Sequence, residues 1–409
     1  MDSHGAARTS RTARTEEQRQ QDLIKINKYR ELEGSIRAQV SANSYDASLF
    51  QLTSKLLRLN PEYYTIWNVR RRCLISGLLS APLGGSSPSK VSPSTSRNDT
   101  TNQSSDYSSL SSSDATLRDR DSPTVGKSGT IVDGKGREET DGDVNILETE
   151  LAFTIPLLVE FPKCYWIWKY RKWLLEQGTL RLPMTATRKI WETELALASK
   201  MLNKDRRNFH AWGYRRYVVA ALESPSLGGK SMVEDEFAYT TKMIHADLSN
   251  FSAWHNRSRL ILRLLEERGA DDAARKAFLD EELNIIQGAL NVGPEDQSLW
   301  YYHQYMVSQI INHVDGSTIT PALTITERVA YLRKEIDWIK DLLEDYTDTK
   351  WIYEALLEYT VALKSLAEHG SENIQIEDPS KWLAKVRVLD PMRAGRWDDV
   401  EKQLCANQY

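Results

Sequence analysis

A tryptophan that recurs at a nearly fixed interval constrains the fold of this chain more than any other feature. Its clearest copies, separated by 44, 42 and 46 residues, are Trp168, Trp212, Trp254 and Trp300. Trp67 precedes Trp168 by 101 residues, and a weaker copy at Trp351 follows Trp300 by 51. A period between about 20 and 50 residues is typical of repeat proteins, in which each unit packs only on its neighbours. We therefore expect a repeat architecture.

Each repeat reads as a hairpin of two helices. Residues 187–202 carry apolar side chains at helical spacing, residues 203–208 form a polar turn, and a second helix follows from Phe209. An aliphatic residue lies ten positions before each of the first five tryptophans, at Leu57, Leu158, Leu202, Ile244 and Leu290. This constant offset indicates one hairpin geometry. The period exceeds the roughly 34 residues of the tetratricopeptide repeat.

A basic residue follows most of these tryptophans by three positions, so both side chains lie on one helix face. These structural repeat residues are Trp67, Arg70, Trp168, Arg171, Trp212, Arg215, Trp254, Arg257 and Trp300, and His303 stands at the fifth basic position. We predict that the tryptophans fill the space between hairpins and that the arginines reach turn carbonyls or acids of a neighbouring repeat. The alternative is that some of these faces line a concave groove and bind a partner.

One segment lacks the repeat. Residues 80–144 are rich in Ser, Thr, Asp and Gly with few apolar side chains, so we predict a disordered insert. The chain then divides into an N-terminal basic and helical lead-in (1–44), a first repeat (45–79), the insert, the remaining repeats (145–366) and a C-terminal helical closing segment (367–409). Residues 84–143 offer no core residues and are expected to be dispensable.

Composition excludes several classes of function. The net charge of −4 and the isoelectric point of about 6.1 argue against a nucleic-acid partner. The three cysteines, Cys73, Cys164 and Cys405, form neither a disulfide framework nor a zinc pattern, which favours a reducing compartment and no metal site in this chain. No apolar run approaches the roughly 20 residues of a membrane span. We expect a cytoplasmic protein.

The repeats also carry a family signature. Two turns read Pro-x-x-Tyr-x-x-Trp-x-x-Arg, over residues 61–70 and 162–171. With residues 205–216, 250–257 and 296–303, this pattern resembles the α subunit of protein prenyltransferases, and most of all that of Rab geranylgeranyltransferase (type II). The resemblance covers residues 45–366 without the insert. It implies an all-α fold, an α-α superhelix in which right-handed helical hairpins form a crescent around a β subunit.

The resemblance also implies an activity. The heterodimer would transfer geranylgeranyl from geranylgeranyl diphosphate to C-terminal cysteines of Rab GTPases presented by a Rab escort protein. This chain would hold no cofactor, and zinc, with magnesium as a further candidate, would belong to the β subunit and the active site. The family lysine that approaches the prenyl diphosphate corresponds to Lys163, the catalytic candidate. Tyr165 and His210 are candidates for positions near the substrate, with packing and capping roles as the alternatives.

One residue separates the members of this family. Enzymes that read a C-terminal CaaX box carry glutamine directly after the motif tyrosine, whereas this chain has Trp166. This difference argues against the shared α subunit of the CaaX farnesyltransferase and geranylgeranyltransferase type I, which stays an alternative. The second alternative is a non-catalytic helical repeat scaffold. Scaffold proteins of that kind lack both the repeat period and the tryptophan–arginine signature of this chain. Aromatic positions such as Tyr214, Tyr301 and Tyr302, which we expect to be exposed, predict an obligate heterodimer.

Overall fold

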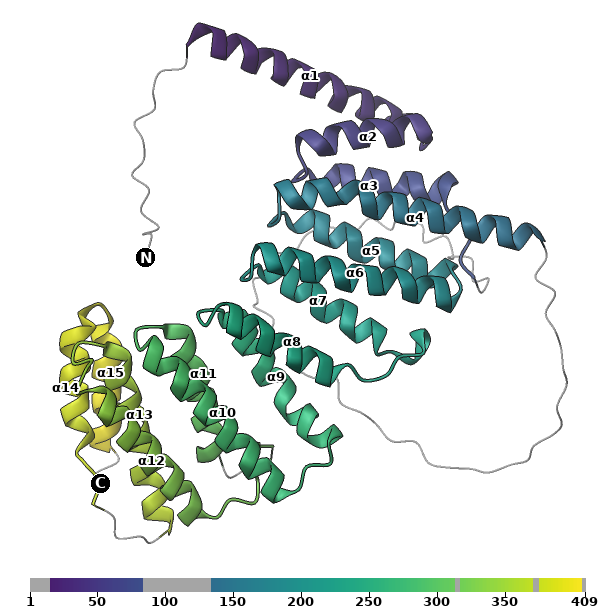
Figure 1. The fold of residues 1–409 in the computed structure, drawn as a ribbon. Helices are drawn as coiled ribbons and strands as arrows, with labels where there is room; N and C mark the ends of the chain where they lie inside the picture. The colour runs from purple at the N-terminus through teal and green to yellow at the C-terminus, as the bar shows by residue number, and fades with distance from the viewer. Residues whose placement is uncertain (1–14, 84–133, 313–316, 371–374, 407–409) are drawn as a thin grey trace, which may run out of the picture. The chain divides into compact units, whose positions relative to one another are not determined.

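The computed structural model describes residues 15–83, 134–312, 317–370 and 375–406, and all regular secondary structure in these ranges is helical (Figure 1). This confirms the predicted all-α class built from helical hairpins. No described helix is long and apolar enough to cross a membrane. The chain divides into two compact units, residues 1–159 with 169–186, and residues 160–168 with 187–409. Each unit is considered separately.

Unit 1 contains the first hairpin and the helices next to it in sequence. These are α1 (Glu16–Ser41), α2 (Ala47–Leu59), α3 (Tyr64–Cys73) with a π-turn at Leu74–Leu78, α4 (Gly134–Glu160) and most of α5 (Tyr165–Arg181). Asp46 begins α2 because its side chain accepts a hydrogen bond from the backbone N–H of Leu49. Leu56 and Leu57 are fully buried, and the Trp67 ring packs 4.7 Å from that of Tyr170. The first predicted repeat therefore has a true core.

The insert ends earlier than the sequence suggests. Residues 84–133 lie outside the described residues, but α4 already begins at Gly134, so the predicted boundary at 144 is wrong. Asp143 is buried and accepts hydrogen bonds from the backbone N–H and the hydroxyl of Ser80. The Ser80 carbonyl in turn accepts from Arg181 Nε at 2.8 Å. The polar composition of this region gave no sign of the contact, which joins the two ends of the insert. The segment that we expect to be dispensable is therefore limited to 84–133.

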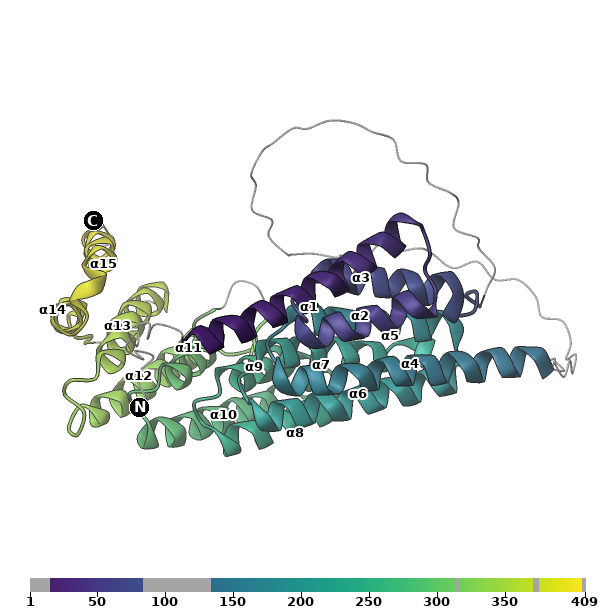
Figure 2. The same cartoon turned by 90° about the horizontal axis from the view of Figure 1, so that it is seen from above.

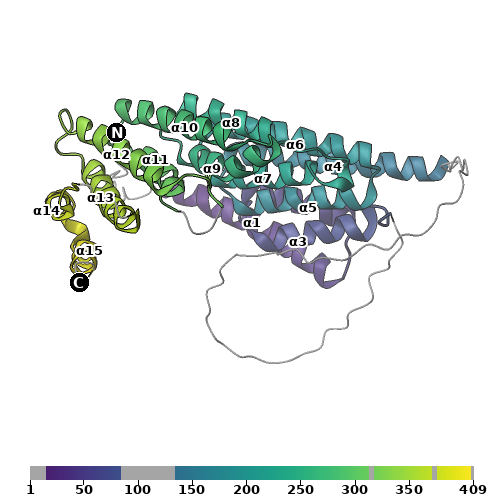
Figure 3. The same ribbon diagram turned by 90° about the horizontal axis from the view of Figure 1, so that it is seen from below.

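Unit 2 contains four hairpins and a closing pair of helices. In chain order they are α6 (Met184–Lys204) with α7 (Phe209–Leu222), α8 (Val233–Ala246) with α9 (Phe251–Glu267), α10 (Asp272–Val292) with α11 (Gln297–Ile311), α12 (Ile325–Leu342) with α13 (Lys350–Gly370), and α14 (Pro379–Leu389) with α15 (Ala394–Ala406). Short 3₁₀ helices lie at Pro225–Leu227 and Pro391–Arg393. Helices α6, α8 and α10 form one layer, and α7, α9 and α11 form the other (Figures 2 and 3).

Every repeat tryptophan anchors its own turn. The indole N–H donates to the carbonyl six residues earlier, with distances of 2.6–2.9 Å, in Trp67–Pro61, Trp168–Pro162, Trp212–Arg206, Trp254–Leu248 and Trp300–Pro294. The rings are buried, so this bond satisfies an N–H that would otherwise be unpaired in the core. The tryptophan therefore fixes where the second helix begins relative to the turn, which explains its constant register.

The sixth copy is displaced from its predicted position. Trp351 is half-buried, whereas Tyr353 is buried and donates its hydroxyl to the Thr347 carbonyl, again six residues earlier, at 2.8 Å. Tyr353 therefore takes the place of the repeat tryptophan, and the alignment on Trp351 is wrong by two residues. The tyrosine hydroxyl makes the same bond to a turn carbonyl as the indole N–H does in the other repeats. This repeat therefore has no tryptophan at the equivalent position.

Two of the three aromatic residues expected to be exposed are buried. Tyr214 and Tyr302 are almost inaccessible, and only Tyr301 is exposed. A one-residue shift along a helix rotates a side chain by about 100°, so neighbours in sequence face opposite environments. The heterodimer prediction therefore rests on other exposed rings, such as Tyr165 and Phe209.

Candidate functional site

The three site candidates lie on two neighbouring turns of unit 2. Lys163 belongs to the turn before α5, Tyr165 is the first residue of α5, and His210 is the second residue of α7. The Tyr165 and His210 rings are 6.1 Å apart, and Phe209 packs on His210 at 3.9 Å. The structure thus brings together residues that are 45 positions apart in the sequence.

Lys163 is exposed and only weakly held. Its side chain is 70% accessible, and Nζ lies 3.8 Å from Asp205 Oδ2. An exposed ion pair at this distance contributes little to stability because water screens it. The ammonium can therefore leave Asp205 for a stronger anion without a large penalty. An exposed and loosely paired ammonium of this kind is compatible with binding an anion.

Asn208 joins the two turns, and the sequence reasoning assigned it no role. Its amide N–H donates to the Pro162 carbonyl at 3.0 Å, while its side-chain oxygen accepts from the backbone N–H groups of His210 and Ala211. It caps α7 and fixes the Lys163 turn at the same time. Asn250 repeats the bond, donating to the Arg206 carbonyl at 3.1 Å. The sequence does contain a signal for this role, because an asparagine lies four residues before two of the repeat tryptophans.

The repeat arginines lie in the core, and three of them form ion pairs that link two hairpins. Arg70 pairs with Glu150, Arg215 with Glu236 and Arg257 with Glu282, with Nε–Oε distances of 2.6, 2.9 and 2.8 Å. In each pair the glutamate comes from the first helix of the next repeat. We call these three pairs the arginine joints. Arg171 donates to the Leu151 carbonyl, at 2.6 Å, and to the Thr154 hydroxyl, both on the first helix of its own hairpin.

In two of the arginine joints, a tyrosine hydroxyl donates a further hydrogen bond to the glutamate. Tyr170 donates to Glu150 and Tyr302 to Glu282, at 2.6 and 2.5 Å, and Tyr214 binds Glu194 in the same way. Burial, followed by the Glu282 charge, raises the pKa of Tyr302 well above its usual value, so the phenol stays a donor. Sequence reasoning missed these acids, although each lies 18 residues before a repeat tryptophan.

The fifth repeat uses histidine at this position. His303 and Glu335 are fully buried, with Nε2 2.9 Å from Glu335 Oε2. The other ring nitrogen lies 2.9 Å from the Tyr359 hydroxyl, and Gln287 donates to both Glu335 oxygens. The fifth repeat therefore keeps the contact with a glutamate of the next hairpin, with a histidine in place of the larger arginine.

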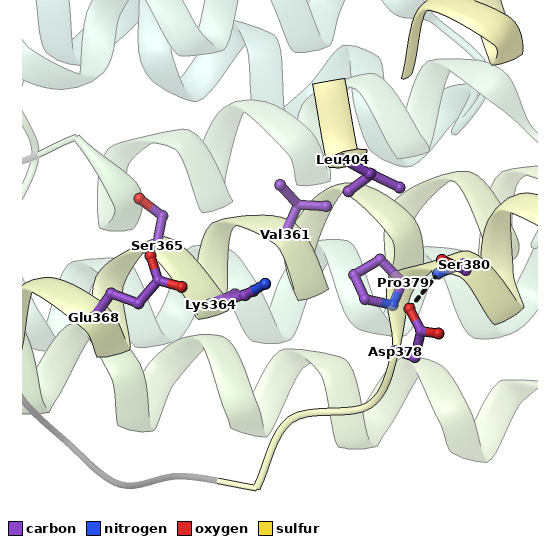
Figure 4. A pocket seen from close by; sticks show the side chains of 8 residues that line it. All are labelled: Val361, Lys364, Ser365, Glu368, Asp378, Pro379, Ser380 and Leu404. Carbon is purple, nitrogen blue, oxygen red and sulfur yellow. Dashed lines mark hydrogen bonds between the residues drawn. The ribbon is translucent and has the colours of Figure 1, made fainter. Parts of the chain in front are cut away.

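Metal-ligand groups and cavities in the described chain were the other candidates for a site. Among the described residues there is no group of three or more His, Cys, Asp or Glu that could hold a metal ion. A cavity of about 320 Å³ lies among α13, α14 and α15 (Figure 4). Its Asp378 caps α14 by accepting from the Ser380 N–H at 2.9 Å, and that bond lowers the Asp378 pKa. This cavity contains none of the predicted site residues.

Comparisons with known proteins identify the family. Residues 47–76, 147–178, 191–222, 233–264 and 279–310 match the protein prenyltransferase alpha subunit repeat. The chain is 30% identical over 400 residues to the geranylgeranyl transferase type-2 subunit alpha of Schizosaccharomyces pombe, which covers 95% of this chain and 96% of that protein. This chain belongs to the protein prenyltransferase α subunit family.

Other members agree with this assignment. The Saccharomyces cerevisiae type-2 subunit alpha is 29% identical, covering 93% of each chain. The Bos taurus subunit is 27% identical, and the match covers 70% of this chain but only 38% of that longer protein. Candida albicans protein geranylgeranyltransferase-I complexed with GGPP has a similar fold, with a TM-score of 0.51, 17% identity and coverage of 92% of this chain and 91% of that one. That structural likeness extends to the fold alone.

Trp166 is the second residue of α5, directly after Tyr165. Its ring lies 5.0 Å from that of Tyr165, edge to face, and the side chain is half-buried. An indole offers one hydrogen-bond donor and no acceptor, whereas a glutamine amide offers both. The start of α5 therefore presents aromatic surface at the position where the resemblance implies a glutamine amide in members that read a CaaX box.

Proposed function

We propose that this chain is the α subunit of a heterodimeric Rab geranylgeranyltransferase. With a β subunit, it would transfer geranylgeranyl from geranylgeranyl diphosphate to C-terminal cysteines of Rab GTPases presented by an escort protein. The observation that carries the proposal is the similarity to type-2 alpha subunits along nearly the whole chain. Trp166 supports the same choice over the enzymes that read a CaaX box.

The proposed role of Lys163 follows from where charge develops. When the acceptor thiolate forms its bond to C1 of the prenyl group, the C1–O bond breaks and its electron pair leaves with the diphosphate. A cation near that oxygen stabilises the transition state more than the ground state, because the charge is greatest as the bond breaks. The exposure of Lys163 and its loose pairing with Asp205 suit this role.

His210 and Tyr165 would shape the same site. Their rings, with Phe209, form an aromatic wall beside the lysine turn. Apolar ring faces suit an isoprenoid chain, and the exposed Lys163 ammonium suits the diphosphate. The zinc expected in the β subunit would activate the acceptor thiol. In the proposed enzyme, this chain would contribute binding and charge stabilisation.

A transfer assay with two acceptors tests the proposal. The full-length chain is co-expressed with its β subunit, and the purified complex receives labelled geranylgeranyl diphosphate. One acceptor is a Rab GTPase with its escort protein, and the other is a protein that ends in a CaaX box. We expect transfer to the Rab alone, and only with the escort protein. Transfer to the CaaX protein would support the shared α subunit instead, and transfer to neither would leave the scaffold alternative.

A further inference from the structure

The carboxylate that pairs with Lys163 comes from the turn of the next repeat. Lys163 lies five residues before Trp168, and Asp205 lies seven residues before Trp212. The lysine side chain is 70% accessible and the aspartate side chain 33%, with Lys163 Nζ 3.8 Å from Asp205 Oδ2. The pair therefore lies at the surface beside the two turns, where an anion can approach both groups.

The turn fixes the carboxylate and leaves the ammonium free to move. The Asp205 N–H donates to the Met201 carbonyl at 2.9 Å, and the Asp205 carbonyl accepts from the Asn208 N–H at 3.2 Å. Asp205 Oδ1 accepts from the backbone N–H of Arg207 at 3.3 Å, and Oδ2 is the oxygen that pairs with Lys163. Lysine carries its charge on a flexible four-carbon stem. Transfer of the ammonium to another anion therefore requires only rotation of the lysine side chain.

The next repeat contains an equivalent pair that is held more firmly. Arg207 lies five residues before its repeat tryptophan and Asp247 seven before the following one, as Lys163 and Asp205 do. Asp247 also accepts from the backbone N–H two positions later, that of Ser249, at 3.2 Å. Arg207 donates to both Asp247 oxygens, at 3.3 Å each. Two parallel bonds fix a guanidinium in one geometry, whereas the single contact at 3.8 Å does not fix an ammonium.

An ammonium that already has a counter-ion gains less from a new anion. Lys163 must leave Asp205 when a diphosphate binds, so the lost pair offsets part of the attraction in the ground state. For an exposed pair, this offset corresponds to about a two- to fivefold weaker affinity. When the bond between carbon and the diphosphate oxygen breaks, the charge on the leaving group is greatest, and the ammonium gains most. The pair thus reduces binding of the intact substrate without reducing the final gain.

We propose that Asp205 is a positioning residue for the diphosphate step. It holds the Lys163 ammonium while the site is empty, releases it to the prenyl diphosphate and takes it back when the diphosphate product leaves. Asp205 acts only through Lys163 and makes no contact with the substrate. The inference rests on the proposed function, because that function supplies the diphosphate.

Binding of inorganic pyrophosphate to the purified heterodimer tests this role. Asp205→Asn keeps an oxygen to accept from the Arg207 N–H and removes the charge. By calorimetry, we expect it to bind pyrophosphate about two- to fivefold more tightly than wild type. In transfer assays, the KM for geranylgeranyl diphosphate should fall by the same factor, while the single-turnover rate at saturating substrate changes by less than about twofold. Unchanged or weaker pyrophosphate binding would overturn the proposal.

Two further variants separate the charge of Asp205 from its place in the turn. Asp205→Glu keeps the charge and should bind pyrophosphate within about twofold of wild type. A gain as large as that of Asp205→Asn would show that turn geometry sets the affinity, and the proposal would be wrong. In a Lys163→Ala background, Asp205→Asn should have no effect, because the aspartate acts through the lysine. A gain that persists without Lys163 would mean that Asp205 repels the anion directly, which also contradicts the proposal.

The matched control makes the same substitution one repeat later. Asp247→Asn keeps the acceptor for the Ser249 N–H and removes the charge that pairs with Arg207. Its affinity for pyrophosphate should equal that of wild type, because Arg207 is not the group that approaches the diphosphate. An equal gain for Asp247→Asn would show that any lost negative charge at these turns has the effect, and would refute the role of Asp205. Transfer by the wild-type complex is measured in parallel, so failure of the proposed function is seen separately from failure of the pyrophosphate series.

Discussion

The arginine joints and the turn site place basic side chains of one repeat motif in opposite environments. Arg257 is almost fully buried, binds Glu282 with two nitrogens and lies 3.8 Å over the Phe237 ring. Lys163 is largely exposed and has one carboxylate at 3.8 Å. A buried charge is tolerated only when all of its hydrogen bonds and ion pairs are made within the protein. Such a group has no remaining donor for a ligand. An exposed and loosely held charge keeps donors for a ligand, so we expect the turn to serve function and the joint to serve stability.

Removing a joint arginine should have the largest effect on stability. Arg257→Ala leaves Glu282 buried without its cation, which typically costs about 3–5 kcal/mol. We expect a strongly lowered melting temperature of the purified complex, followed by circular dichroism. The control is Arg268→Ala, which removes an exposed pair with Glu234 at a cost of about 0–1 kcal/mol. Similar melting of both variants would mean that the joints do not hold the hairpins together.

Removing the turn lysine should affect the rate and leave stability unchanged. Lys163→Ala deletes one charge-stabilising donor, which typically costs about 2.7–4 kcal/mol in the transition state, or about 10²–10³ in rate. The measurement is the single-turnover transfer rate, together with binding of the prenyl diphosphate, which should change little. Lys200→Ala on α6 serves as the control. A wild-type rate for Lys163→Ala would make Lys163 a solvated turn residue.

Removing a single hydroxyl from a joint should have a smaller effect. Tyr302→Phe deletes the donor to Glu282, and a hydrogen bond to a charged group contributes about 1.5–3 kcal/mol. Tyr305→Phe is the matched comparison, because that hydroxyl donates to the neutral Ser258 carbonyl at 3.0 Å and should contribute about 0.5–1.5 kcal/mol. The melting temperatures of the two purified variant complexes show which hydroxyl contributes more to stability. The reverse order would show that the tyrosine is not part of the joint.

Deleting residues 84–133 should have the smallest effect of all. This deletion keeps Ser80, Asp143 and Arg181, whose contacts join the two ends of the segment. We expect an unchanged melting temperature and transfer rate. The longer deletion of 84–143 removes Asp143 as well, and should lower the melting temperature because Ser80 and Arg181 lose their buried partner network. If the two deletions behave alike, the Ser80–Asp143 contact is not structural.

The sequence by itself determined the repeat, the hairpins and the positions of their turns. These follow from local rules: helical spacing of apolar residues, prolines in turns, and a tryptophan whose indole reaches six residues back in its own chain. Lys163, Tyr165 and His210 lie at or beside two of these turns, but only the family resemblance singles them out. The family resemblance added their chemistry, and their roles stay predictions.

The tertiary structure alone decided which residues meet across repeats. Arg70 and Glu150 are 80 positions apart, and no periodicity within one hairpin indicates that pair. The bonds of Asn208 to Pro162, the place of Tyr353 in the sixth repeat and the burial of Tyr214 also depend on how neighbouring helices pack. Helix formation depends on neighbours within a few residues, whereas packing depends on the rotation and offset of whole helices. Small changes in that rotation exchange buried and exposed positions, so only the assembled hairpins separate the joints from the free surface.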